Sequence, residues 1–405
     1  MRILIVSQVF WPDNVAVAQH VFDLAEYLAK KGESVDALAS TKDYENPNIT
    51  YLKKENYQSI NITRLNGTSF SKKSKLGRLI NFTAFNLQVF FKILFLKKKE
   101  YDAVIGLTVP PMLSFLTLLA LKGKNIKFVY WAMDLQPELS IIAGFFKERS
   151  FATKLLLWMG NYVFKKADLI IALDKYMKDY IIKRTGQSDK ITVIPVWPVM
   201  YEIYNEEKIK NPFRIENNFS DKIIVMYSGN HSVMHPLDTL LKTALALSDD
   251  PRFLFVHIGG GVRIKDVSNF KDQHGLENIL LLPYQPREKI HISLGAADLQ
   301  VVIQGKECVG FTHPNKIYGA MFIGKPILYI GPKPSHVTDL LEKCPGNIMI
   351  SHGEEKKLIK ELQNFALLSE SKKQEIGQNN RNFAKANFTK EFLLEKSYQA
   401  LLTLV

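Results

Sequence analysis

The chain has 405 residues, which is too long for one ordinary core and predicts two domains of about 200 residues. Its 46% hydrophobic and 23% charged residues are typical of a folded globular protein. Only two cysteines occur, Cys308 and Cys344, far apart in the chain. They exclude a disulfide framework and a cysteine-based metal site, which favours a reducing cytoplasm.

The net charge of +13 indicates an anionic partner, and nucleic acid, lipid headgroups and phosphorylated substrates all qualify. Residues 72–99 hold eight Lys or Arg and no Asp or Glu, with Leu, Ile and Phe between them. This pattern resembles a basic, apolar helix on an anionic membrane, although a core helix with solvated ends gives it too. Polar residues such as Asn81 and Asn86 disfavour a transmembrane span. No nucleic-acid motif accompanies the cations, so we expect no nucleic acid partner.

Six short β-branched runs alternate with helical stretches over the first 200 residues. They lie at residues 2–7, 34–39, 103–107, 127–131, 168–173 and 190–194. Such alternation predicts parallel strands joined by crossover helices. The first run is too short for a signal-peptide core, so we interpret it as the first strand of a domain over residues 1–200. A polar stretch with Pro212 then predicts a linker at 201–220.

A second series of strand-like runs predicts another doubly wound domain over residues 221–380. Its runs lie at 222–227, 253–258, 279–282, 298–303, 326–330 and 347–350. A helix over 381–405 follows, which we expect to pack back on the first domain. The predicted fold class is α/β, with two Rossmann-like domains facing across a cleft. Ligands of such sheets bind beyond the carboxyl ends of the strands, where motifs are therefore expected.

The opening of the chain carries a specific resemblance. A strand, Trp11-Pro12, an amphipathic helix, Lys31-Gly32 and a second strand follow one another. This series resembles the opening of GT-B glycosyltransferases of the large retaining family 4, which includes colanic-acid and O-antigen sugar transferases. These proteins usually have a Gly-Gly pair where this chain has Val15-Ala16-Val17-Ala18. On the acceptor side, the resemblance implies roles for Trp11, Asn14 and His20.

Residues 107–111 and 130–138 resemble the same subgroup. The second segment is similar to an Asp-Leu-Trp-Pro-Glu cleft motif, with Gln136 in place of Trp. Asp134 and Glu138 are four residues apart, so they share a face if they are helical. We expect Asp134 to act in catalysis and Glu138 on the acceptor side, by accepting hydrogen bonds from sugar hydroxyls or stabilising positive charge. The alternative is that Asp134 caps a helix.

In the second domain, residues 227–238 read as a strand, a glycine turn and a helix start. Exposed amides in such a turn bind phosphate. The segment resembles the Gly-Asn or Gly-Thr-His variants of O-antigen transferases. This implies donor contacts from Gly229, Asn230 and His235 and a catalytic role for His231, whereas a histidine in such a place is often structural.

Two further loops are candidates for donor binding. Residues 256–263 run from a strand into three adjacent glycines, and Gly260 and Gly261 would let the backbone approach a ligand closely. Arg263 ends this loop. Residues 282–287 resemble the loop that holds the nucleotide base in this family, which makes Arg287 a possible contact.

Residues 305–326 carry the most informative motif. They resemble a Pro-Ser-Lys helix followed by Gly-Lys-Pro, which closes the donor site in this subgroup. Lys316 falls in the first helical turn and would add its charge to the helix dipole at the diphosphate. His313 and Asn315 beside it are further donor candidates. Two family glutamates are absent, which leaves Glu307 as the candidate for the ribose.

The resemblance implies transfer of a sugar from a nucleotide diphosphate donor, UDP-linked, to a lipid-linked or polysaccharide-precursor acceptor, with retention and without a metal or cofactor. It also implies surface-glycan synthesis at the inner face of a bacterial plasma membrane. Breaking the anomeric C–O bond builds negative charge on the leaving oxygen, so cations and amides aimed at that oxygen are the main requirement. Two alternatives remain at this point, a nucleotide-sugar 2-epimerase and a non-catalytic glycan- or nucleotide-binding relative.

Overall fold

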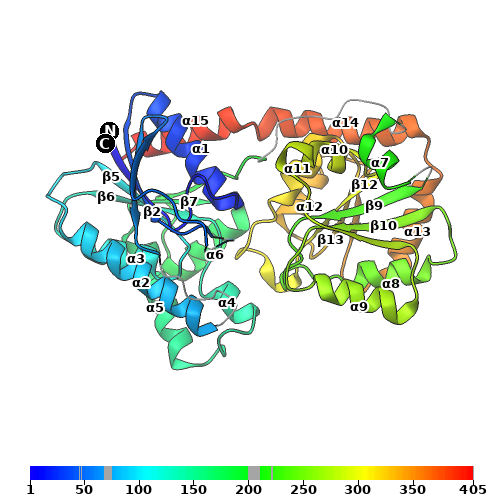
Figure 1. Cartoon of the computed structure of the whole chain (residues 1–405), viewed down its shortest axis with the longest axis horizontal. Coiled ribbons are helices and arrows are strands. Elements are labelled where there is room, and N and C mark those ends of the chain that lie inside the picture. Colours follow the sequence, from blue (N-terminus) through cyan, green and yellow to red (C-terminus); the bar gives the residue numbers. More distant parts are fainter. Residues whose placement is uncertain (45, 47, 68–74, 199–209, 220–221, 405) are drawn as a thin grey trace. The chain divides into compact units, whose positions relative to one another are not determined.

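The computed structural model describes residues 1–44, 46, 48–67, 75–198, 210–219 and 222–404 (Figure 1). Contacts divide the chain into two units. Unit 1 comprises Met1–Val199, Gly310–His313 and Lys390–Val405, and unit 2 comprises Met200–Val309 and Pro314–Thr389. Lys72 and Lys73 of the predicted basic segment and residues 201–209 of the predicted linker lie outside the described residues.

Unit 1 is built on an eight-stranded sheet in the order β3-β4-β2-β1-β5-β6-β7-β8. All neighbouring strands are parallel except β3 and β4. The strands are β1 (Arg2–Val6), β2 (Ser34–Ser40), β3 (Lys54–Tyr57), β4 (Ile60–Leu65), β5 (Ala103–Leu107), β6 (Lys127–Ala132), β7 (Leu169–Ala172) and β8 (Ile191–Val193). The strand order reverses between β1 and β5, which is where sheets of this kind bind ligands. The sequence missed β3 and β4.

The helices of unit 1 connect these strands and follow the last one. They are α1 (Ala16–Lys30), α2 (Lys75–Leu94), α3 (Leu113–Leu121), α4 (Glu138–Ile142), α5 (Phe151–Lys166), α6 (Lys175–Thr185) and α15 (Lys390–Leu402). Within the unit α15 packs beside α1, and the hydroxyl of Tyr27 on α1 donates a hydrogen bond of 2.5 Å to Glu395 on α15. No helix among the described residues has both the length and the apolar character needed to cross a membrane.

Unit 2 is built on a six-stranded, wholly parallel sheet in the order β11-β10-β9-β12-β13-β14. Its strands are β9 (Ile223–Ser228), β10 (Phe253–Ile258), β11 (Ile279–Leu282), β12 (Leu299–Ile303), β13 (Ile327–Ile330) and β14 (Ile348–Ile350). The order reverses between β9 and β12. Its helices are α7 (Pro212–Glu216), α8 (Asp238–Ala246), α9 (Ile264–His274), η2 (Arg287–Lys289), α10 (Ile290–Gly295), η3 (Lys306–Cys308), α11 (Lys316–Ile323), α12 (His336–Leu341), α13 (Glu355–Ala366) and α14 (Glu370–Asn387).

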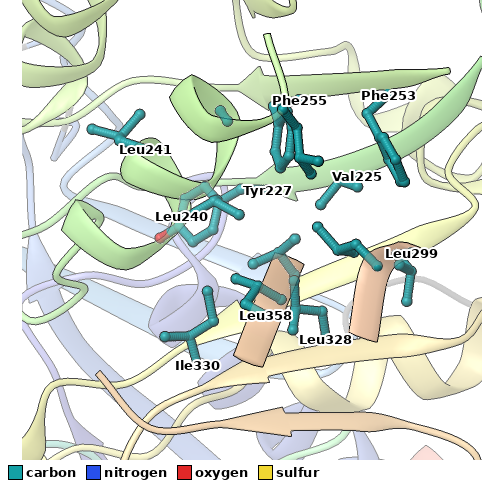
Figure 2. Packing of buried hydrophobic residues seen from close by; sticks show 14 of the residues in the cluster. Val225, Tyr227, Leu240, Leu241, Phe253, Phe255, Leu299, Leu328, Ile330 and Leu358 are labelled. Atoms are coloured by element: carbon teal, nitrogen blue, oxygen red, sulfur yellow. The ribbon is translucent and has the colours of Figure 1, made fainter. Parts of the chain in front are cut away.

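The core of unit 2 lies on both faces of this sheet. Successive side chains of a strand point to opposite faces, so Val225 and Tyr227 of β9 join one cluster while Ile224 and Met226 join the other. Figure 2 shows the first cluster, in which β9 and β10 pack with α8 and α13. Because both faces are covered, the strands read in the sequence as continuous apolar runs.

Part of the segment predicted as a linker is helix α7 of unit 2. The side chain of Asn211 caps it by accepting from the backbone of Phe213 at 2.9 Å, and Pro212 occupies its first turn. Arg214 is buried, where it donates to the carbonyl of Ala296 at 2.6 Å and pairs with Asp298 at 3.2 Å. Residues 212–216 therefore belong to the packed structure of unit 2.

Helix α11 is fixed in place by its contact with α14. A Cβ at Gly377 of α14 would lie 2.0 Å from the carbonyl oxygen of Gly324, where α11 ends with φ of 74°. Arg381, one turn further along α14, donates to the carbonyl of Ile323 at 2.6 Å. The two helices thus meet backbone to backbone, and Lys316 at the other end of α11 is positioned through this contact.

We expect Gly377→Ala to destabilise unit 2, because the added methyl group has no room against the backbone of Gly324. The free energy of unfolding should fall by about 1–3 kcal/mol, as is typical of overpacking. A urea titration monitored by circular dichroism measures this loss. Gly319→Ala on α11 is the matched control, since its methyl group would meet nothing within 4 Å. That variant should be unchanged or more stable by up to about 1 kcal/mol. Equal unfolding midpoints for both variants would contradict the proposed contact.

Candidate functional site

The ammonium group of Lys316 lies beside the glycine turn that follows β9. It sits 3.7 Å from the centroid of the Tyr227 ring and donates a hydrogen bond of 3.2 Å to the carbonyl of Asn230. Gly229 has φ of 120°, and a Cβ there would lie 2.9 Å from Cε of Lys316. Burial of the ammonium lowers the pKa of Lys316 from 10.5 to about 7. The arrangement holds a poorly solvated cation next to exposed backbone, which suits an anion.

The histidines of this turn are held neutral inside unit 2. His231 is fully buried, and its ring nitrogens lie 3.2 Å from the carbonyl of Gly260 and 3.2 Å from Nδ1 of His257. Burial lowers the pKa of His231 to about 4, and the charge of Lys316 adds to the effect. His235 bonds to the hydroxyl of Tyr227 at 2.8 Å, and burial lowers its pKa to about 3. Both rings brace the loop without adding charge.

The glycine-rich loop after β10 packs against the same turn. The backbone N–H of His231 donates to the carbonyl of Gly260 at 2.7 Å. Gly261 has φ of 118°, and a Cβ there would lie 2.2 Å from the side-chain oxygen of Asn230. The two predicted loops are therefore joined, and the close approach requires glycine. Arg263 ends the loop, with its guanidinium bonded to Asp266 at 2.6 Å.

The remaining candidates of unit 2 are exposed. Glu307 lies in η3 after β12, in a loop that is tied to the turn after β9 because Gly305 donates to the carbonyl of Met234 at 2.8 Å. Asn315 is the residue before α11. Arg287 begins η2, which follows the edge strand β11. Helix α11 instead connects β12 to β13, on the other side of β9. Loops after β9, β10 and β12 thus gather most of the donor candidates at one sheet edge.

In unit 1 the predicted carboxylate Asp134 follows β6 at the carboxyl edge of the sheet. Its backbone N–H donates to the hydroxyl of Thr108, which follows β5, at 3.4 Å. Its side chain caps no helix, since α4 begins only at Glu138 with Pro137 as N-cap residue. Burial raises the pKa of Asp134 from 3.8 to about 6, and the neighbouring imidazole of His313 opposes this shift. Asp134 is thus a carboxyl group that titrates near neutral pH.

His313 was expected in the donor domain, but its side chain belongs to unit 1. Residues Gly310–His313 cluster with that unit, and Nδ1 of His313 lies 2.7 Å from the carboxylate of Asp174. His20 is buried nearby in α1, edge-on to Trp197 with ring centroids 5.1 Å apart. Among the described residues neither ring nitrogen of His20 has a hydrogen-bond partner, and burial lowers its pKa to about 3.

The other acceptor-side candidates make structural contacts. Glu138 is buried and accepts from the hydroxyl of Tyr180 at 2.6 Å and from the guanidinium of Arg184. It does not share a helical face with Asp134, because the residues between them are not helical. The ring of Trp11 is stacked on Tyr57, with centroids 3.8 Å apart. Asn14 is exposed before α1, and its carbonyl accepts from Gln19 at 2.7 Å.

Comparison with known proteins identifies the first unit. Residues 17–196 match the family model described as Glycosyltransferase Family 4. This part of unit 1 is therefore similar to glycosyltransferase family 4 domains. The chain is 22% identical over 320 residues to WbjE of Pseudomonas aeruginosa, described as a probable glycosyltransferase, with 76% of this chain and 78% of WbjE covered. It is 21% identical over 365 residues to WcaI of Escherichia coli K12, covering 85% of this chain and 87% of WcaI, whose description places it in colanic acid biosynthesis as a glycosyl transferase.

The fold is also that of solved glycosyltransferases. The structure superposes on Anabaena Alr3699/HepE in complex with UDP-glucose with a TM-score of 0.73 and 16% identity, covering 100% of both chains. This likeness confirms the GT-B fold expected from the sequence. Together with WbjE and WcaI it supports glycosyltransferase activity for this chain.

Several residues that shape this candidate site were missed by the sequence analysis. Tyr227 was seen only as the end of a strand, although its ring underlies Lys316. Asp174 and Thr108 hold His313 and the Asp134 backbone from distant points in the chain. Their common signal is a polar residue at or just beyond the end of a parallel strand.

We expect Asp134→Asn to make stability less dependent on pH. Between pH 4 and pH 6 the folded chain keeps a proton on Asp134 that the unfolded chain releases, so the native protein loses stability as pH rises through this window. The unfolding free energy of the variant, relative to that of the native protein, should therefore be about 1–3 kcal/mol higher at pH 7.5 than at pH 4. Thermal unfolding at both pH values measures this gain. The same substitution at the exposed Asp179 of α6 is the control, and a gain of equal size there would refute the assignment.

Proposed function

We propose that the chain transfers a sugar from a UDP-sugar to a lipid-linked or polysaccharide-precursor acceptor in bacterial surface-glycan synthesis, with retention at the anomeric carbon. Unit 2 binds the donor and unit 1 binds the acceptor. UDP is favoured because HepE is described in complex with UDP-glucose. Surface-glycan synthesis is favoured because the description of WcaI names colanic acid biosynthesis.

The observation that carries the donor assignment is Lys316 beside the turn at Gly229. A partly buried ammonium whose partners among the described residues are a ring and a carbonyl gains most from a ligand that brings negative charge. The diphosphate of a nucleotide sugar supplies that charge. Backbone amides of the turn and the glycine loop complete the cradle, as in other phosphate sites.

The chemical step breaks the bond between the anomeric carbon and the β-phosphate oxygen and forms a bond to the acceptor oxygen. Negative charge grows on the departing phosphate, where the ammonium of Lys316 and the turn amides stabilise it. The acceptor hydroxyl proton goes to the departing phosphate oxygen. This matches retention, since that oxygen leaves from the face on which the acceptor enters.

His231 supports this step indirectly. Its buried ring is engaged with Gly260 and His257, so it holds the two phosphate loops together. Because burial keeps it neutral, it leaves Lys316 as the cation of this cluster. His231 is therefore a positioning residue rather than a proton donor to the leaving group.

Asp134 is the acceptor-side group of this proposal. A carboxyl group with a pKa near 6 accepts hydrogen bonds from sugar hydroxyls when ionised, and it stabilises positive charge at the anomeric carbon. His313 and Asp174 form a second polar pair at the same edge of unit 1, 2.7 Å apart. Asn14 is exposed after β1, the strand beside β5 at the switch point.

Sugar transfer, 2-epimerisation and simple binding give different products with the same donors. A panel of UDP- and GDP-sugars, with and without a lipid-linked acceptor, separates them. A transferase releases nucleotide and lengthens the acceptor, an epimerase changes the sugar without acceptor, and a binding protein only raises the melting temperature with its ligand.

We expect Lys316→Ala to lower the rate of transfer about tenfold to a thousandfold, as does the loss of other groups that stabilise a developing negative charge. The assay is release of UDP from the best donor of the panel. Lys360→Ala, which removes an exposed lysine of α13 in the same unit, is the control and should keep the native rate. Unchanged turnover in Lys316→Ala would refute the donor assignment.

We expect binding of UDP-glucose to take up close to one proton per chain at pH 8. The free lysine, with a pKa of about 7, is mostly neutral at that pH, and the bound diphosphate favours its charged form. At pH 6 the lysine is already charged, so uptake should vanish there and binding should be tighter. Titration calorimetry in buffers of different ionisation enthalpy measures the uptake. Equal uptake by Lys316→Met would assign the proton to another group.

A further inference from the structure

Unit 1 contains an apolar cavity that the donor assignment does not use. Its volume is about 530 Å³, within the range of about 300–1,000 Å³ typical of ligand pockets. It lies among α2, α3, α4 and α5, and its lining includes Leu79, Phe82, Phe115, Leu155, Leu156 and Met159. Lining residues from four helices make it a built pocket rather than a surface depression.

Several polar atoms of the lining are bonded to the protein, although the side-chain oxygen of Asn86 has no partner among the described residues. The amide of Asn86 donates to the carbonyl of Pro111 at 2.8 Å, and the hydroxyl of Ser114 donates to the carbonyl of Leu107 at 2.7 Å. Ser140 donates to the side-chain oxygen of Gln136 at 2.6 Å. The lining is therefore mainly hydrocarbon surface, which suits a hydrocarbon ligand.

The stretch of sequence that supplies most of the lining combines exposed apolar side chains with positive charge. Twelve of the 21 large hydrophobic side chains exposed among the described residues lie between Leu79 and Trp158. Residues 72–166 hold sixteen Lys or Arg against five Asp or Glu, which is +11 of the net charge of +13. The loop before α5 carries both kinds, with Phe145, Lys147 and Arg149 exposed. A hydrocarbon chain that bears an anionic group matches this combination.

One end of the cavity reaches the candidate acceptor site. Thr108 lines the cavity, and its hydroxyl also accepts from the backbone N–H of Asp134 at 3.4 Å. Gln136 and Pro137, which follow Asp134, line it as well. A surface that only anchors the protein to a bilayer needs no pocket at the strand ends. The continuity therefore indicates a ligand that takes part in the reaction.

We propose that this cavity binds the hydrocarbon chain of a phosphate-bearing lipid, and that this lipid carries the acceptor. The inference rests on the proposed function, because it identifies the acceptor of the same transfer. The hydrocarbon chain of the lipid lies among α2, α3 and α5, and the phosphate of the lipid lies near the cations of this region. The reacting hydroxyl, beyond the phosphate, is then directed toward the strand ends at Asp134.

The probes are geranyl phosphate and farnesyl phosphate, which share a headgroup and differ by five carbons. Titration calorimetry is performed on the full chain, below the concentrations at which the probes form micelles. Each methylene buried strengthens binding about fourfold, so farnesyl phosphate should bind at least about tenfold more tightly than geranyl phosphate. Its binding should also show a negative heat-capacity change.

Two variants fill the cavity in different ways. Ala152→Trp adds a large side chain at an exposed lining position in the first turn of α5. Gly160→Leu adds one within α5, where a Cβ would meet only the carbonyl oxygen of Gln136 at 3.6 Å. Both should lower the affinity for farnesyl phosphate at least about tenfold. Ala386→Trp, at an exposed alanine of α14 in unit 2, is the matched control and should bind as the native chain does.

Native affinity in both cavity variants, with unchanged melting temperatures, would overturn the inference. The inference would also be overturned if the cavity variants no longer floated with phosphatidylglycerol vesicles but still bound farnesyl phosphate. The region would then be a membrane-docking surface only. Failure of the proposed function is distinct from either result. It would appear as no release of UDP or transfer of sugar with any donor, while farnesyl phosphate still binds in the cavity.

Discussion

The partial burial of one ammonium group organises the candidate donor site of unit 2. Lys316 is held against the Tyr227 ring and the Asn230 carbonyl, and burial alone is enough to move its pKa to about 7. Neither partner carries a negative charge, so the fold holds the lysine where its charged form is disfavoured. The surrounding turn comes within van der Waals contact of the lysine at Gly229, where a φ of 120° favours glycine. A bound diphosphate would remove this electrostatic cost.

The rest of unit 2 serves this arrangement. Backbone contact between α14 and α11 through Gly377 fixes where α11 lies, and with it the lysine at its first turn. On the other side, His231 links the turn to β10 through His257 and Gly260. These imidazoles stay neutral because they are buried next to a cation, so they add rigidity without repelling it. Rigid neutral supports around one cation are what a preorganised anion site requires.

The sequence predicted most of the fold because strands buried on both faces read as apolar runs. It missed β3 and β4, where polar side chains alternate with apolar ones near the edge of the sheet. It took α7 for a linker because Asn211 and Pro212, the cap and first turn of a helix, are also loop residues. Glycine turns and the lysine helix were found from local pattern. His313 and Asp174 are 139 positions apart, so only the tertiary structure shows that they pair. The sequence analysis placed His313 in the donor domain because its neighbours along the chain belong there.

The two candidate reactive groups differ physically from two buried, ion-paired carboxylates of the chain. Glu138 is buried with Arg184, and Asp298 with Arg214, so each of these charges has an opposite partner and stabilises its surroundings. Burial instead moves the pKa of Asp134 up to about 6, although His313 opposes this shift, and burial moves the pKa of Lys316 down to about 7. A fold gains nothing from a buried charge that lacks a partner, so such a group is a candidate for binding a charged or polar ligand. By this criterion Asp134 and Lys316 remain candidates for the site, whereas Glu138, which the same sequence motif suggested, is engaged by Arg184 within unit 1.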